Sequence, residues 1–129
     1  MNLDKKIKNQ DGQALVEFAL TLWIFILVFL AIAEFGRAFN TLNVLTSAAR
    51  EGVRVAAVTG PDADQVRTTA NRILSSANIT GATVSLSGPN TAREVTVTVQ
   101  YTYVPLTGSM IPGLSNIAMN RSSTMRWEN

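Results

Sequence analysis

The first pattern along the chain is an apolar run near its N-terminus. Residues 14–33 read ALVEFALTLWIFILVFLAIA, in which Glu17 is the only charged residue. A helix over this range would be about 30 Å long, which is the thickness of the hydrocarbon core of a bilayer. A helix in the core of a soluble protein rarely stays apolar on every face over such a length. The run therefore predicts a transmembrane segment at residues 14–33.

The helical pattern continues beyond this run. Apolar residues recur at steps of three and four and would form a stripe along one face; they are Phe35, Phe39, Leu42, Leu45, Ala49, Val53 and Ala56. Polar residues and a glycine follow the same rhythm about 100° around the helix; they are Gly36, Asn40, Asn43, Ser47, Arg50 and Arg54. No proline occurs between Ala14 and Val58, which favours one long helix over residues 13–58, about 70 Å in length. The alternative is a break at Gly36 that separates the membrane helix from a second helix.

A shorter amphipathic helix is predicted next. Thr59-Gly60-Pro61 would end the long helix. Asp62 is suited to the N-cap position, and Gln65 three residues later would complete a capping box. The apolar face of this helix consists of Ala63, Val66, Ala70, Ile73, Leu74 and Ala77. We expect the helix to end near Gly81.

After Gly81 the period of the pattern changes from 3.6 to 2. Val84 and Leu86 alternate with polar residues, and a turn is predicted at residues 88–90. The clearest strand follows this turn, and its apolar face consists of Val95, Val97, Val99, Tyr101 and Tyr103. Pro105 would end this strand.

The rest of the chain predicts a loop and a third strand. Residues 106–116 are expected to form a loop that contains Pro112-Gly113, and residues 117–127 a more irregular strand. The predicted fold class is therefore α+β, with a long N-terminal helix and a C-terminal head at residues 59–129 built from one helix and a short antiparallel sheet. Because so small a head has a marginal core, we expect it to pack against the second half of the long helix.

Charge adds an orientation to this picture. Lys5, Lys6 and Lys8 precede the apolar run, and the chain has no lysine after it. The positive-inside bias therefore predicts that the N-terminus lies in the cytoplasm and the head outside. The 11 Lys and Arg residues are nearly balanced by 9 Asp and Glu, and no basic tract follows the leader, so no nucleic-acid partner is expected.

The sequence offers little for catalysis. The 129 residues include no Cys and no His, which removes disulfides, thiolate chemistry, an imidazole base and most zinc sites. Asp62 and Asp64 form a carboxylate pair, but their position at a helix start is better explained by capping and the helix dipole. We therefore expect no catalytic, metal-binding or cofactor-binding residues, no cofactor, and no enzymatic activity.

Two signals for proteolytic processing compete. Ala31-Ile32-Ala33 has the A-x-A pattern of a secretory signal site, and a cut there would release a soluble protein that starts at Glu34. The apolar run, however, is longer than a usual signal h-region and contains an acid. A cut between Gly12 and Gln13 would instead remove the lysines and keep the membrane helix.

This second signal resembles a known class. A short basic leader, then Gly12, then Gln13-Ala14-Leu15-Val16-Glu17 and a long apolar helix, is similar to a class III, type IV prepilin-type signal. More narrowly, GQALVEFAL, AEFGRAF, SAAREGVRVAAV and the C-terminal SSTMRWE resemble the TadE-like family of tight-adherence (Tad, Flp or type IVb) pilus systems. The resemblance is specific in the N-terminal half. One departure is that residues 21–23 lack the proline that many relatives carry in the early apolar run.

The resemblance implies a fold, partners and a location. The fold would be type IV pilin-like, with residues 1–12 as a leader peptide and residues 13–58 as the long helix. The protein would be a single-span minor pilin or pseudopilin of the bacterial inner membrane, and would reach the cell surface within a pilus used for attachment. Its partners would be a prepilin peptidase, other pilin subunits, the inner-membrane assembly platform and, before assembly, membrane lipid. Gly12 and Gln13 would flank the cleaved bond, and Glu17 would become the fifth mature residue.

The single acid in the apolar run can be interpreted physically. An ionised carboxylate at the centre of a membrane helix costs about 2.5–3.5 kcal/mol, and less near the interface. Glu17 could simply reach the cytoplasmic headgroups. In a filament, where helices pack on helices, the new amine on Gln13 of a neighbouring subunit would be its natural partner. We therefore predict a role for Glu17 in subunit assembly. A different class of function also remains open, namely a single-span binding or sensor module that never polymerises.

Overall fold

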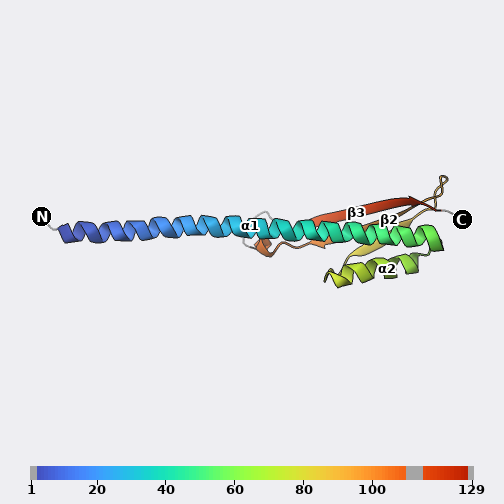
Figure 1. Cartoon of the computed structure of the whole chain (residues 1–129), viewed down its shortest axis with the longest axis horizontal. Helices are drawn as coiled ribbons and strands as arrows, with labels where there is room; N and C mark the ends of the chain where they lie inside the picture. Colours follow the sequence, from blue (N-terminus) through green and yellow to red (C-terminus); the bar gives the residue numbers. More distant parts are fainter. Residues whose placement is uncertain (1–2, 110–114, 128–129) are drawn as a thin grey trace. The chain divides into compact units, whose positions relative to one another are not determined.

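The computed structural model describes residues 3–109 and 115–127, with side chains from Gly12 onward except at Ser109. The elements are helix α1 (Leu3–Thr59), helix α2 (Ala63–Ser76), strand β1 (Thr83–Ser87), strand β2 (Glu94–Tyr103), the 3₁₀ turn η1 (Leu106–Ser109) and strand β3 (Ile117–Arg126) (Figure 1). The predicted α+β, pilin-like fold is confirmed. The predicted turn at Pro112-Gly113 and the first two residues of the predicted leader lie outside the described residues.

Helix α1 is one helix from Leu3 to Thr59, without the alternative break at Gly36. It begins before the predicted start at Gln13, because the leader has no proline and a single glycine at position 12 costs only about 1 kcal/mol in a helix. The chain divides into two compact units, residues 1–35 and residues 36–129.

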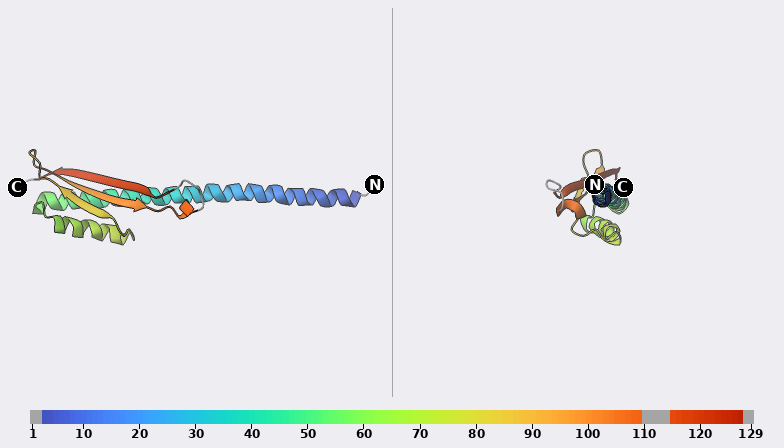
Figure 2. Two further views of the ribbon diagram at one scale, coloured as in Figure 1. Left: turned by 180° about the vertical axis from the view of Figure 1, so that it is seen from behind. Right: turned by 90° about the vertical axis from the view of Figure 1, so that its left-hand side faces the viewer.

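The core of the second unit is built by α1, α2 and the sheet together. Helix α1 contributes Leu45, Ala48, Ala49, Val53 and Ala56, helix α2 contributes Val66, Ala70 and Leu74, and the strands contribute Val84, Val95, Val97, Val99, Tyr103 and Met119. Within this unit both helices cover the same face of the sheet (Figure 2). The expected packing of the head against the second half of the long helix is therefore confirmed.

The apolar stripe of α1 is shorter than predicted. Phe35 and Phe39 are 73% and 57% exposed, and Leu42 is the first member of the predicted stripe that is partly covered. Periodicity predicts which side of the helix is apolar, but it does not show how far the sheet extends along the helix. Phe35 and Phe39 thus belong to the predicted stripe but not to the core.

Helix α2 is capped at both ends. Asp62 Oδ1 accepts hydrogen bonds from the backbone N–H groups of Asp64 (2.9 Å) and Gln65 (3.4 Å), which confirms the predicted N-cap. In a complete capping box the Gln65 side chain would accept a hydrogen bond from the Asp62 N–H. Here the Asp62 N–H donates to the Gly60 carbonyl instead (2.8 Å).

The C-terminal end of α2 differs from the prediction. The helix ends at Ser76 rather than near Gly81, since Asn78 adopts a left-handed conformation (φ 56°). The Ile79 N–H donates to the Leu74 carbonyl (2.9 Å) and the Asn78 N–H to the Ser75 carbonyl (3.0 Å), which together form a Schellman motif. Ile79 and Leu74 both lie in the core, so this end of the helix is also fixed by packing.

The sheet has the order β1-β2-β3 and is antiparallel throughout. The predicted inner face of β2 is confirmed, with Val95, Val97, Val99 and Tyr103 buried and Tyr101 half-buried. The predicted loop after β2 contains η1, and β3 ends at Arg126 rather than Trp127.

Strand β3 pairs only with β2 among the described strands and so forms one edge of the sheet. The Trp127 N–H donates to the Arg93 carbonyl (2.7 Å), and the register places Arg126 opposite Glu94. Because opposed residues of an antiparallel pair alternate between hydrogen-bonded and non-hydrogen-bonded, the backbone groups of even-numbered β3 residues face away from β2. The Asn120 carbonyl fits this pattern, since it accepts a bond from Arg121 Nη1 (3.3 Å).

This alternation predicts the pattern of amide hydrogen exchange in β3. In the isolated chain, the amides of Asn120, Ser122 and Thr124 should exchange fast, whereas those of Arg121, Ser123 and Met125 should be protected by β2. Residue-resolved exchange measured by NMR on the chain in detergent micelles tests this. Equal protection of both sets would contradict the position of β3 at the edge.

Candidate functional site

The residues predicted for processing lie on α1. Gly12 and Gln13 are exposed, and a Cβ added at Gly12 would have nothing within 4 Å outside its own helix backbone. The bond between them lies inside a helical segment. A peptidase that binds an extended substrate would have to unwind this part of the helix, and glycine lowers the cost of doing so by about 1 kcal/mol relative to alanine.

Glu17 lies one helical turn beyond Gln13, so the two side chains are on the same face of α1. Its backbone carbonyl accepts a hydrogen bond from Thr21 Oγ1 (2.8 Å). Within the described ranges 12–109 and 115–127, no ion pair involves the Glu17 carboxylate. The helix therefore places Gln13 and Glu17 on one face, and the side chains described from Gly12 onward form no ion pair with the acid.

The apolar part of α1 has the properties of a membrane span. The helix from Gly12 to Thr59 contains an 18-residue window of mean hydropathy 2.7, and none of this window is buried within the chain. A helix in the core of a soluble protein would be covered by other elements, whereas these side chains are exposed to their surroundings. The helix is compatible with a single-span membrane anchor.

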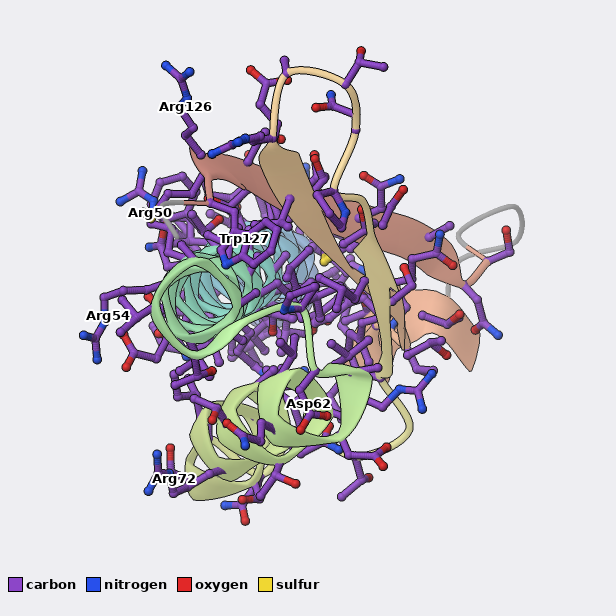
Figure 3. All side chains as sticks on the ribbon, turned by 90° about the vertical axis from the view of Figure 1, so that its right-hand side faces the viewer. Arg50, Arg54, Asp62, Arg72, Arg126 and Trp127 are labelled. Atoms are coloured by element: carbon purple, nitrogen blue, oxygen red, sulfur yellow. The ribbon has the colours of Figure 1, made fainter. Side chains whose placement is uncertain are left out.

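The charged residues of the second unit have structural explanations. Arg54 Nη2 lies 2.6 Å from Glu51 Oε1, and Arg54 Nε donates to Glu51 Oε2 at 3.0 Å. The hydrogen bond from Arg54 lowers the pKa of the Glu51 carboxyl, and the same contact raises the pKa of Arg54. Arg50, Arg54, Arg72 and Arg126 point away from the core, and Asp62 sits at the start of α2 (Figure 3).

The structure assembles no cluster with the chemistry of a metal centre among the residues it describes. No group of three or more His, Cys, Asp or Glu side chains gathers there. The Asp62–Asp64 pair is accounted for by the N-cap, because an Asp62 oxygen accepts the Asp64 N–H. These observations leave α1 as the candidate functional element of the chain.

The fold and the long apolar helix define a pilin-like α+β protein with one candidate membrane span. Residues 12–54 match the family model described as TadE-like protein. The resemblance to the TadE-like family is thus confirmed over this segment, which begins at Gly12 and includes Glu17 and the part of α1 that packs in the core. No curated protein and no solved structure matches the chain. The matched segment is about a third of the chain, and it is similar to a family whose members are associated with Tad pili.

Proposed function

We propose that this protein is a minor pilin or pseudopilin of a Tad-type (type IVb) pilus and has no enzymatic activity of its own. A prepilin peptidase cuts between Gly12 and Gln13. Before assembly the mature chain spans the inner membrane, with its N-terminus in the cytoplasm and its head outside. The assembly platform then incorporates it into, or uses it to initiate, a filament for surface attachment. The observation that carries this proposal is the TadE-like match over residues 12–54, which begins at the glycine of the predicted cleavage site.

Two features of α1 support the proposal. The exposed apolar span gives the chain a membrane anchor before assembly and an apolar surface for helix packing after it. Glu17 lacks an ion-pair partner within the described residues of the chain, and cleavage after Gly12 creates an amine on each neighbouring subunit. A subunit that polymerises through α1 explains both features, whereas a stand-alone sensor module explains only the anchor.

The test is the N-terminal sequence and intact mass of the protein from its own cells. We expect a start at Gln13 for the wild type and an uncut chain for Gly12→Leu. Gly36→Leu is the matched control, because a Cβ at Gly36, as at Gly12, meets nothing within 4 Å outside the helix backbone. It should be cut normally.

The other possible termini decide between the remaining interpretations. A start at Met1 in wild-type protein would contradict processing and favour an uncut anchored module. A start at Glu34 would favour a secreted protein. Cleavage of Gly12→Leu at the same rate as wild type would show that Gly12 does not define the site.

A further inference from the structure

The proposed cleavage leaves a glutamine at the N-terminus of the mature chain. Gln13 follows Gly12 directly, and its side chain is exposed on α1. It also immediately precedes the apolar run at residues 14–33, so in the anchored chain it lies at the interface with water rather than in the hydrocarbon core. A cut after Gly12 therefore places a free α-amine and a carboxamide on one exposed residue.

An N-terminal glutamine carries a nucleophile and an electrophile in the same residue. The unprotonated α-amine attacks Cδ of the side chain, the new C–N bond closes a five-membered lactam, and the bond from Cδ to the amide nitrogen breaks. That nitrogen leaves as ammonia with the proton that the attacking nitrogen gives up, so the product is pyroglutamate and the reaction needs no co-reactant. A peptide α-amine has an ordinary pKa of about 8, so part of it is unprotonated near neutral pH.

Helix α1 places one carboxylate beside the new amine. Glu17 lies one turn beyond Gln13 on the same face, and helical side chains lean toward the N-terminus of their helix, so the carboxylate extends back toward the amine. The charged residues of the leader leave with it, and Glu17 is the only charged residue within the apolar run. An adjacent carboxylate stabilises the protonated amine, which cannot attack. Glu17 of the same chain therefore slows the cyclisation.

We propose that Gln13 cyclises to pyroglutamate in subunits that have been cut but not yet assembled, and that a cyclised subunit no longer enters a filament. The inference rests on the proposed cleavage and on the proposed pairing of Glu17 with the amine of a neighbouring subunit. Cyclisation turns that amine into a neutral lactam, so the neighbour's Glu17 loses its partner. The reaction thereby limits the time during which a processed subunit remains able to assemble.

The reaction can be followed by the intact mass of the chain. Protein is isolated from the membranes of its own cells at intervals after its synthesis is stopped. We expect a species that starts at Gln13 and lacks the mass of one ammonia to increase with time, and pyroglutamyl aminopeptidase should expose Ala14 in this species. Gln13→Ala is the matched control, because it keeps the amine and removes the carboxamide. The mass of its cut form should stay constant.

The role of Glu17 is measured on the mature chain purified in neutral detergent micelles, where no filament forms. Glu17→Gln should cyclise about twofold faster than wild type, which is the effect typical of a charge pair one helical turn apart. Glu51→Gln removes the same charge from the same helix at a residue paired with Arg54, far along α1 from the amine. It should cyclise at the wild-type rate.

The consequence for assembly is measured by comparing two fractions of the same cells. The cyclised share of the subunit should be at least about tenfold lower in sheared surface fibres than in the membrane, because a filament that accepts the lactam leaves a buried carboxylate unpaired. Equal shares in the two fractions would show that assembly does not need the amine, and would overturn the inference.

The other outcomes separate the inference from the proposed function. If the wild-type chain starts at Gln13 and its mass never falls below that of the uncyclised form, the cleavage stands and the inference is overturned. If the chain starts at Met1, the proposed cleavage fails and the inference fails with it. Equal rates for Glu17→Gln and wild type in micelles would contradict the protection of the amine by Glu17.

Discussion

Replacing Gly52 by leucine should destabilise the second unit by about 3 kcal/mol or more. Gly52 is buried at the point where α1, α2 and β2 meet. A Cβ built there would lie 3.2 Å from Val97 Cγ1 and 3.4 Å from Val66 Cγ1, which leaves no room for the rest of a leucine side chain. Because domains of this size are stable by only about 5–15 kcal/mol, such a loss is a large part of the total.

The change can be measured by urea unfolding of the full chain in micelles. Trp127 packs against the core and reports on it by fluorescence, in a background that carries Trp23→Phe. Gly36→Leu is the control, since a Cβ at Gly36 meets nothing within 4 Å outside the helix backbone, and its midpoint should not fall.

A graded variant sharpens this prediction. Gly52→Ala gains about 1 kcal/mol of helix propensity but brings its Cβ close to Val97, so its effect should be far smaller than that of leucine. An unchanged midpoint for Gly52→Leu would show that α1 is not seated on the sheet at this residue.

The order and type of the elements could be predicted because periodicity reports them directly. Alternation along β2 and the steps of three and four along α2 each correspond to a buried face in the structure. Periodicity could not predict the point along α1 at which burial begins. Burial of Phe39 depends on whether the sheet reaches it, and the sheet does not cover it.

Two local features were missed although the sequence carried a signal for them. Asparagine is second to glycine at the left-handed position after a helix, and Asn78 takes that position before Gly81. Small residues at Ala48, Ala49, Gly52 and Ala56 share the buried side of α1 and allow a close approach of the sheet.

Gln13 and Glu17 lie on one exposed face of α1, and their proposed roles in processing and assembly stay predictions. Their chemistry depends on a second molecule. The amine that we propose as the partner of Glu17 does not exist before cleavage, and in the filament it belongs to another subunit.

Replacing Glu17 by glutamine should therefore leave the isolated subunit intact and reduce its incorporation into filaments at least about tenfold. Removing one partner of a buried ion pair costs about 3–5 kcal/mol, because the other charge is left unpaired in a medium of low dielectric constant, and about 1.4 kcal/mol already corresponds to a factor of ten. Glutamine keeps the size and the helix propensity of glutamate, so membrane insertion and cleavage should be unaffected.

The measurement is the amount of subunit that co-sediments with sheared surface fibres, relative to the amount in the membrane. Glu51→Gln is the matched control, because it removes the same charge from the same helix at a residue whose partner, Arg54, lies in the same chain. It should incorporate normally. If Glu17 only reaches the cytoplasmic headgroups, the two variants will incorporate equally. In that case the carboxylate has no partner in the filament, so replacing it by glutamine leaves no other charge unpaired. A selective loss with Glu17→Gln requires that the carboxylate be used in the assembled state, which is the distinction between a subunit that polymerises and one that is only anchored.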